Sequence, residues 1–200
     1  LLTSDAIFRR VSSSGRWEAM ATPSPASPLT CLAVVPAQTH PSQQSRPATM
    51  LAGAGSSDLY LSKDQGRTWT PVRSRAFTRA GGLVSLLATP EGFVIGAAAD
   101  GTLYWSHDEF QVWRQIESAS TLDPVSLLRT IGDRCVAATS SGHLHAIDLA
   151  PETPTMQPLS ANLGDYPIND VAGAGLTWGL ALKGGGAAFF HRRRKALDPV

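Results

Sequence analysis

The stretch "LYLSKDQGRTW", residues 59–69, joins a short apolar run to polar residues and a tryptophan at fixed intervals. Its regularly spaced residues are Ser62, Asp64, Gly66, Thr68 and Trp69. An Asp in this position can accept hydrogen bonds from the backbone N–H groups of its own turn, and Gly supplies a positive φ. Thr favours a strand that restarts, and a Trp that folds back buries roughly 150–250 Å². The spacing therefore predicts a self-bonded turn between two strands.

The same pattern returns 44 residues later, in "LYWSHDEFQVW", residues 103–113. The matching pairs are Tyr60 and Tyr104, Ser62 and Ser106, Asp64 and Asp108, and Trp69 and Trp113. The second copy has Phe110 at the position of the glycine and Val112 at the position of the threonine. A period of about 44 residues is typical of one propeller blade.

Each repeat reads as four short strands. An apolar run comes first, in residues 29–36, 83–90, 125–132 and 168–175. A strand of small residues, a turn, a third strand and a short fourth strand follow, and Asp100-Gly101 predicts a type I′ turn between the second and third strands. Four antiparallel strands per repeat define a propeller blade. The sequence predicts an all-β fold, a β-propeller of four-stranded antiparallel blades with four whole blades and one partial blade.

The repeats set the expected organisation of the chain. Residues 1–20 match only the back part of a repeat, and the following blades are expected at 21–72 (with an enlarged loop at 37–47), 73–116, 117–159 and 160–200. A propeller normally closes so that no long sheet edge stays open. Two interpretations follow: a piece of a larger propeller, or a five-bladed ring with one defective blade.

The sequence "SKDQGRTW" resembles the Asp-box of the bacterial neuraminidase repeat family, Ser-x-Asp-x-Gly-x-Thr-Trp, at every defining position. "SHDEFQVW" (106–113) is a degenerate copy, "SSSGRW" (12–17) is a shorter one, and the last two blades have none. The resemblance implies that the box links the third and fourth strands at the rim, away from the ligand-binding end. The box residues Ser62, Asp64, Gly66, Thr68, Trp69, Ser106, Asp108 and Trp113 are therefore expected to be structural.

The resembled family includes sialidases, some glucan-cleaving glycosidases, sortilin-type receptors and photosystem II assembly factors, so the fold alone selects no function. A sialidase would need three arginines from separate blades on one carboxylate, together with an Asp and a Glu–Tyr pair. Here "IFRRV" (7–11) lacks the proline of the usual first arginine motif. A glycosidase needs two carboxylates about 5–9.5 Å apart. The candidates near connections are Asp123, Asp133, Asp165 and Asp170, and no spacing singles out a pair.

The composition limits the classes of partner that we expect the chain to bind. The chain has 200 residues, 42% of them hydrophobic and 16% charged, with a net charge of +1, which favours neither nucleic acid nor an anionic membrane. No apolar run approaches the roughly 20 residues that cross a bilayer. Cys31 and Cys135 lie in apolar strands and are expected to be buried free thiols. The chain starts at Leu1 without a recognisable signal peptide, which leaves the compartment unknown, although the resemblance favours an exported or periplasmic one.

The best binding candidate is the connection "VRSRAFTR" (72–79), where Arg73, Arg75 and Arg79 flank Phe77. Arginine and aromatic residues are enriched at binding hot spots, although a solvated loop is the plainer interpretation. The connections 73–82, 117–124 and 160–167 all lead into first strands and are expected to form the binding surface.

Two other clusters admit more than one interpretation. His143 and His145 share a strand face and could bind a metal, but two ordinary histidines are expected. The run "HRRRK" (191–195) is a solvated basic turn or an anion contact. No metal or cofactor is predicted. The sequence thus favours a non-enzymatic binding or scaffold module for a protein or glycan partner, with an incomplete or remnant sialidase-like glycoside hydrolase as the alternative.

Overall fold

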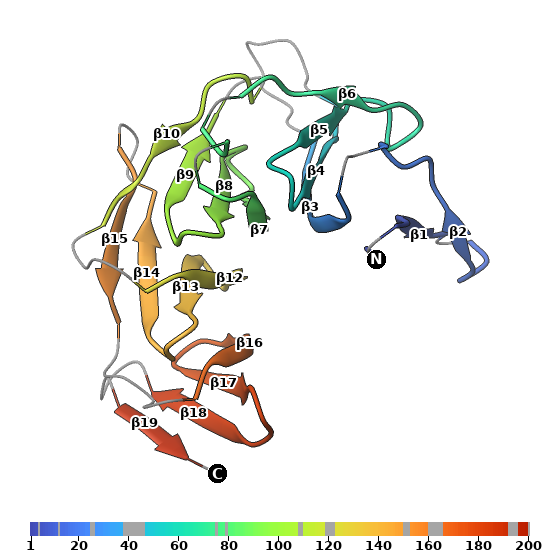
Figure 1. Ribbon diagram of the computed structural model, residues 1–200. Helices are drawn as coiled ribbons and strands as arrows, with labels where there is room; N and C mark the ends of the chain where they lie inside the picture. The colour runs from blue at the N-terminus through green and yellow to red at the C-terminus, as the bar shows by residue number, and fades with distance from the viewer. Residues whose placement is uncertain are drawn as a thin grey trace. The chain divides into compact units, whose positions relative to one another are not determined.

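The computed structural model describes most of the chain. The described residues are 1–3, 5–11, 13–24, 27–37, 47–74, 76–78, 80–107, 110–118, 123–149, 153–159, 166–191 and 196–199. All the regular elements among them are strands, as Figure 1 shows. No helix among them is long and apolar enough to span a membrane.

Four successive sheets each run as an antiparallel meander. The first whole blade contains β3 (Leu29–Val35), β4 (Thr49–Ala54), β5 (Leu59–Ser62) and β6 (Thr70–Pro71), in that order. The second contains β7 (Leu83–Ala88), β8 (Val94–Ala98), β9 (Leu103–Ser106) and β10 (Arg114–Gln115). The third contains β12 (Val125–Ile131), β13 (Arg134–Thr139), β14 (Leu144–Asp148) and β15 (Thr155–Pro158). The fourth contains β16 (Ile168–Ala174), β17 (Thr177–Leu182), β18 (Ala187–His191) and β19 (Ala196–Pro199). These are propeller blades, and the predicted fold class is confirmed.

The partial blade precedes them. It consists of β1 (Phe8–Arg10) paired with β2 (Trp17–Ala19), and an isolated bridge joins Leu2 to Ile7 on the other side of β1. Ile7 is fully buried and packs with Leu29, Met50 and their neighbours of the first whole blade.

The third whole blade has one more strand than the sequence predicted. β11 (Glu117–Ser118), which follows β10, pairs in parallel with the outer strand β15. The connection between two blades thus supplies a fifth strand to the second of them. Its polar sequence, "ES", gave no strand signal.

The predicted type I′ turn at Asp100-Gly101 was wrong. Ala98 N–H donates to Thr102 O at 2.9 Å and Gly101 N–H donates to Ala98 O at 3.0 Å. Gly101 alone of the pair has a positive φ, 89°, so the loop has three residues and ends in a left-handed one. The other second-to-third-strand hairpins have the same bonds, from Ala54 to Asp58, Thr139 to His143 and Leu182 to Gly186, with Ser57, Gly142 and Gly185 in the left-handed position.

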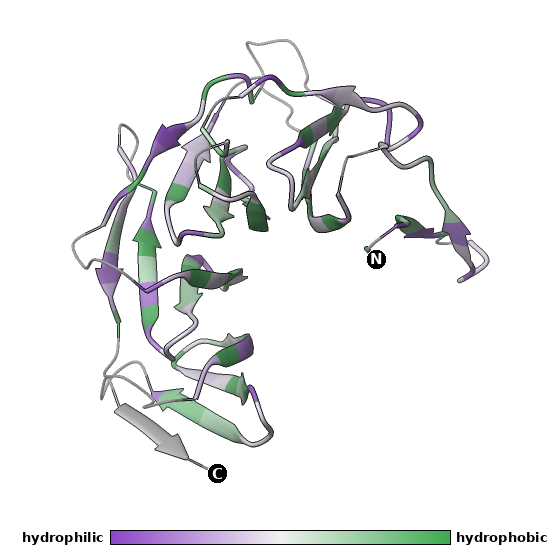
Figure 2. Ribbon diagram, viewed as in Figure 1, coloured by the Kyte–Doolittle hydropathy of each residue, from purple (hydrophilic) through white to green (hydrophobic). Residues whose placement is uncertain are grey.

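The chain divides into two compact units. One comprises Leu1–Gly96 with Ser106–Arg114, and the other comprises Ala97–Trp105 with Gln115–Val200, so the boundary passes through the second whole blade. Each unit contains sheets with apolar cores, and Figure 2 shows hydrophobic residues along the strands of the whole blades. Cys31 and Cys135 are buried free thiols, as predicted, and burial raises the pKa of Cys31 to about 11.

Because the four strands of a blade alternate in direction, each loop lies at one of two ends of its sheet. We call the end at which the first strand begins the first-strand end. The hairpin between the second and third strands also lies at this end. In three of the whole blades, a backbone bond ties this hairpin to the residue before the first strand. The bonds run from Gly55 N–H to Pro28 O (3.3 Å), Ser140 N–H to Pro124 O (2.9 Å) and Lys183 N–H to Pro167 O (2.8 Å). The turn at residues 62–69 lies at the opposite end.

Candidate functional site

The turn at residues 62–69 is held together by one carboxylate. Asp64 Oδ1 accepts the backbone N–H groups of Arg67 (3.0 Å) and Thr68 (2.9 Å) and the Ser62 hydroxyl (2.8 Å), while Oδ2 accepts the Thr68 hydroxyl (2.6 Å). These bonds, led by the one from the Thr68 hydroxyl, hold the pKa of Asp64 well below its usual range. Gly66, at φ 79°, donates its N–H to the Ser62 hydroxyl. All four of these bonds to Asp64 come from residues of the turn.

The two tryptophans of the repeat have different partners. Trp69 Nε1 donates to Ala21 O at 2.7 Å, outside its own sheet. Trp113 Nε1 donates to Phe110 O at 2.9 Å, inside its own turn. Phe110 adopts φ 57° where the first copy has glycine, and it is buried, so its packing compensates for a conformation that bulky residues avoid. Asp108 lies outside the described residues.

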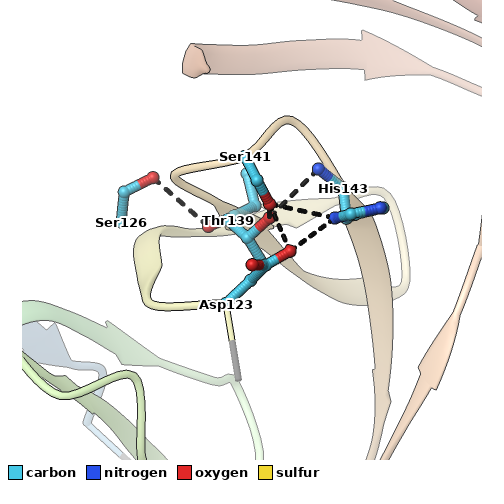
Figure 3. Close-up of polar contacts among 6 residues, drawn as sticks. Asp123, Ser126, Thr139, Ser141 and His143 are labelled. Carbon is cyan, nitrogen blue, oxygen red and sulfur yellow. Dashed lines mark hydrogen bonds and ion pairs between the residues drawn. The ribbon is translucent and has the colours of Figure 1, made fainter. Parts of the chain in front are cut away.

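A polar cluster at the first-strand end of the third whole blade is the best-formed candidate site (Figure 3). Asp123 lies just before β12, and Thr139, Ser141 and His143 lie in the β13–β14 hairpin. Asp123 Oδ2 lies 2.7 Å from His143 Nδ1 and accepts the Ser141 hydroxyl. Ser141 Oγ is also 3.0 Å from His143 Nδ1 and 3.2 Å from Thr139 Oγ1. Side chains therefore reinforce the Ser140–Pro124 backbone bond.

The neighbours of Asp123 favour its ionised form. The Ser141 hydroxyl lowers the pKa of Asp123, burial opposes it, and His143 lowers it further. The side chains of His143 and Asp123 remain 33% and 38% exposed, so they can meet a partner. Behind them His145 is buried, with Nδ1 unpartnered. Burial, then His143, lowers the pKa of His145, so its neutral form is favoured.

The geometry of this cluster differs from that of a nucleophilic Ser–His–Asp triad. A Ser–His–Asp triad uses both ring nitrogens, one for the acid and the other for the serine. Here Ser141 and Asp123 lie on the same nitrogen, Nδ1, and Figure 3 shows the second ring nitrogen of His143 pointing away from both. His143 and His145 have ring centroids 6.3 Å apart, and no group of three potential metal ligands occurs in the described part of the chain.

The structure describes two of the four predicted binding residues, Arg73 and Phe77. Arg73 is exposed, whereas Arg75 and Arg79 lie outside the described residues, as do Arg192–Arg194. Phe77 is fully buried and packs edge-on against Trp113, with ring centroids 4.9 Å apart at 70°. Phe77 therefore belongs to the core and presents no aromatic surface beside the arginines.

Two of the candidate carboxylates that the structure describes, Asp123 and Asp170, lie against basic side chains. Asp170 pairs with Arg129 at 2.9 Å, and Asp165 lies outside the described residues. Asp133 follows β12 and Asp123 precedes it, so the two lie at opposite ends of a seven-residue strand.

Sequence reasoning missed two parts of this surface. Ser141 and Thr139 complete the cluster around Asp123, and Tyr166, 57% exposed, stands beside Pro167 at the first-strand end of the last blade. A signal was present: proline precedes the first strand at Pro28, Pro124 and Pro167, and each carbonyl accepts a hairpin N–H.

The structure resembles solved propellers. It matches the extracellular domain of the one-component system BT4673 from B. thetaiotaomicron with TM-score 0.70 and 16% identity, over 99% of this chain and 25% of that one. It matches YCF48 from Cyanidioschyzon merolae with TM-score 0.63 and 18% identity, over 98% and 66%, and YCF48 bound to D1 peptide with TM-score 0.66 and 13% identity, over 98% and 62%. The Niastella koreensis GH74 enzyme matches with TM-score 0.61 and 18% identity, over 90% and 25%.

These chains differ in how much of them is matched. This chain spans a quarter of the BT4673 domain and of the GH74 enzyme, and about two thirds of YCF48. The sequence matches no family model and no curated protein. At identities of 13–18%, the likeness establishes the β-propeller fold.

Proposed function

We propose that this chain is a non-enzymatic propeller module that binds a protein partner at the first-strand ends of its third and fourth whole blades. The observation that carries the proposal is the set of bonds that hold these ends together. Hairpin N–H groups bond the carbonyls of Pro124 and Pro167, and Asp123 bonds the side chains of Ser141 and His143. A surface held in one conformation before binding loses less conformational entropy when a partner docks.

The groups exposed at these ends suit a protein surface. The side chain of Tyr166 is exposed, and Asp123 and His143 are half-exposed. Tyrosine is among the residue types that most often anchor protein interfaces. YCF48, one of the similar propellers, has been solved bound to D1 peptide, which supports a peptide segment as the bound element. A glycan is the other partner class that such a polar and aromatic surface can accept.

The experiment compares the two ends of blades in the second unit. A phage-displayed library of random peptides would be selected on the wild-type chain, and the selected peptides titrated against Tyr166→Ala, His143→Ala and Asp133→Ala. Asp133 is exposed and lies at the opposite end of β12 from Asp123. We expect at least tenfold weaker binding for the first two, about 1.4 kcal/mol, and no change for Asp133→Ala. Peptides that respond only to Asp133→Ala, or failure to select any, would overturn the proposal; a parallel glycan array tests the other partner class.

The remnant-hydrolase alternative has its own test. Catalysis needs two facing carboxylates, and two of the candidate aspartates are engaged elsewhere, Asp123 with His143 and Asp170 with Arg129. We expect no turnover of a fluorogenic sialoside or of a fluorogenic β-glucoside. Turnover abolished by Asp123→Asn or Asp170→Asn would replace the binding proposal with the enzymatic one.

A further inference from the structure

The Asp123–His143 pair leaves two polar atoms free at the first-strand end of the third whole blade. Asp123 Oδ2 accepts the Ser141 hydroxyl and lies 2.7 Å from His143 Nδ1. Within the described part of the chain, no hydrogen bond reaches Asp123 Oδ1 or His143 Nε2. Both side chains are partly exposed, and Figure 3 shows the second ring nitrogen of His143 pointing away from the cluster. A docked partner can therefore meet this pair.

The bond to Asp123 determines which nitrogen of His143 carries the proton. An ionised carboxylate only accepts hydrogen bonds, so a nitrogen 2.7 Å from it carries the hydrogen that the two atoms share. In the neutral ring the proton is therefore on Nδ1, and Nε2 keeps its lone pair. Asp123 thus makes the outward-facing nitrogen of His143 a hydrogen-bond acceptor.

A second carboxylate belongs to the hairpin that touches this segment. The hairpin between β8 and β9 packs on the residues before β12, since a Cβ built on Gly101 would lie 2.8 Å from Pro124 Cα and 3.3 Å from Asp123 O. Asp100, the residue before Gly101, is exposed, and its Oδ1 accepts the Thr102 N–H at 2.9 Å. All these residues belong to the same compact unit. The site therefore combines two carboxylates with a ring acceptor.

The groups around the pair leave this negative charge uncompensated when His143 is neutral. Among the described residues, His143 is the one ion-pair partner of Asp123, and Asp100 has none. Burial lowers the pKa of His145, which lies behind His143, so its neutral form is favoured. Ser141 and Thr139 complete the surroundings and carry no charge. The complementary group is one that brings a positive charge and several N–H donors.

We propose that the protein partner presents an arginine or lysine side chain that binds Asp123 Oδ1 and His143 Nε2 beside Asp100. This inference rests on the binding function proposed above and names the chemistry of the bound element. Arginine fits best, because its planar guanidinium has five N–H donors and reaches a carboxylate oxygen and a ring nitrogen together. An acidic segment would instead meet two carboxylates and a lone pair, which disfavours it.

Nitrogen-15 NMR of the imidazole rings tests the acceptor without a peptide. At pH 8 we expect the His143 ring to carry its proton on Nδ1. N-acetylarginine amide, the probe, should shift the Nε2 signal of His143, and N-acetylcitrulline amide, which has a similar shape without the charge, should shift it less at the same concentration. A His143 ring that carries its proton on Nε2 at pH 8, or equal responses to the two probes, would overturn the inference.

Three variants locate the response to the arginine probe. Asp123→Ala should abolish it, and Asp100→Asn, which keeps an oxygen for the Thr102 N–H, should weaken it while the circular dichroism spectrum stays like that of wild type. Asp133→Ala, exposed at the opposite end of β12, should retain the full response. An undiminished response in Asp100→Asn, or an equal loss in Asp133→Ala, would remove the carboxylates of this end from the site.

The selected peptides distinguish failure of this inference from failure of the binding function. In peptides whose binding depends on Tyr166, replacing one arginine by citrulline or one lysine by acetyllysine should weaken binding to wild type about tenfold. The same replacement should have little further effect on Asp123→Asn, because the two changes remove one interaction. Peptides that need Tyr166 but keep their affinity without a basic residue would overturn this inference alone. A library that yields no peptide would overturn both.

Discussion

The indole N–H of Trp69 donates a 2.7 Å hydrogen bond to the carbonyl of Ala21, 48 residues earlier in the chain. The ring also packs on the core cluster that contains Ile7 and Met50, against which Met20 packs as well. One side chain at the end of the 62–69 turn thus joins the partial blade, the connection after it and the first whole blade. This contact makes the turn a stabilising element of that unit.

Two substitutions at Trp69 should separate the contribution of ring packing to stability from that of the hydrogen bond to Ala21 O. Trp69→Ala should lower the free energy of unfolding by about 3 kcal/mol, because a large aromatic side chain is removed from the edge of a core. Trp69→Phe keeps most of the ring contact and should cost about 1 kcal/mol for the bond to Ala21 O. Urea titrations followed by circular dichroism measure both. Equal losses for the two variants would show that the packing contributes nothing.

Lowering the pH should reduce the contribution of the Asp64 carboxylate to the stability of the fold. Its folded-state pKa is depressed, so the carboxylate contributes stability above its usual pKa of 3.8 and loses that contribution as the pH falls through the folded value. Asp64→Asn should therefore be less stable than wild type at pH 7, with the difference shrinking as the pH falls below 3.8. Melting temperatures between pH 2 and pH 7 test this. A constant difference across that range would contradict the assignment.

The hairpin at Ser57 offers a stabilising change. Ser57 holds φ 73° at the position that Gly101, Gly142 and Gly185 occupy in the other blades. Ser57→Gly should raise stability by about 0.5 kcal/mol, because relief of the left-handed backbone exceeds the added freedom of the unfolded chain. The reverse change, Gly101→Ser, should cost more than about 1 kcal/mol, since its Cβ would lie 2.8 Å from Pro124 Cα. A destabilising Ser57→Gly would contradict this account.

The blades were predictable because their signals are local and repeated. Each first strand is a short apolar run, and the 44-residue offset from Trp69 to Trp113 fixes the repeat. The turn type at Asp100-Gly101 was mispredicted because the same dipeptide also fits a three-residue loop that needs only one left-handed residue. Strand pairing through β11 depends on the neighbouring blade, which no local pattern of "ES" encodes.

The site was harder to predict because its contacts are distant in sequence. Phe77 reads as an aromatic residue among surface arginines, yet its position is set by Trp113, 36 residues later. Asp123 and His143 each stood out as candidates, for a carboxylate pair and for a metal site. Their pairing depends on the bond from Ser140 N–H to Pro124 O, which brings the hairpin to the start of β12. Neither the composition nor the spacing of the residues indicates that the hairpin approaches the start of β12.

The cluster around Asp123 allows the polar contacts of the first-strand end to be tested without a ligand. The Ser141 hydroxyl is the largest cause of the lowered Asp123 pKa, ahead of His143. Ser141→Ala should therefore raise that pKa toward its usual 3.8, because the ionised carboxylate loses a hydrogen-bond donor. Carbon-detected NMR titration of the aspartate carboxyl groups measures the shift.

The neighbouring Ser140→Ala is the matched control, because Ser140 is exposed and bonds Pro124 O through its backbone N–H, which alanine retains. We expect this variant to leave the Asp123 pKa unchanged. The sign for stability follows from the depressed folded pKa: wild type should exceed Ser141→Ala above pH 3.8, and the difference should vanish as Asp123 is protonated in both. An unchanged pKa in Ser141→Ala, or an equal shift in Ser140→Ala, would show that the Ser141 hydroxyl does not hold the Asp123 carboxylate.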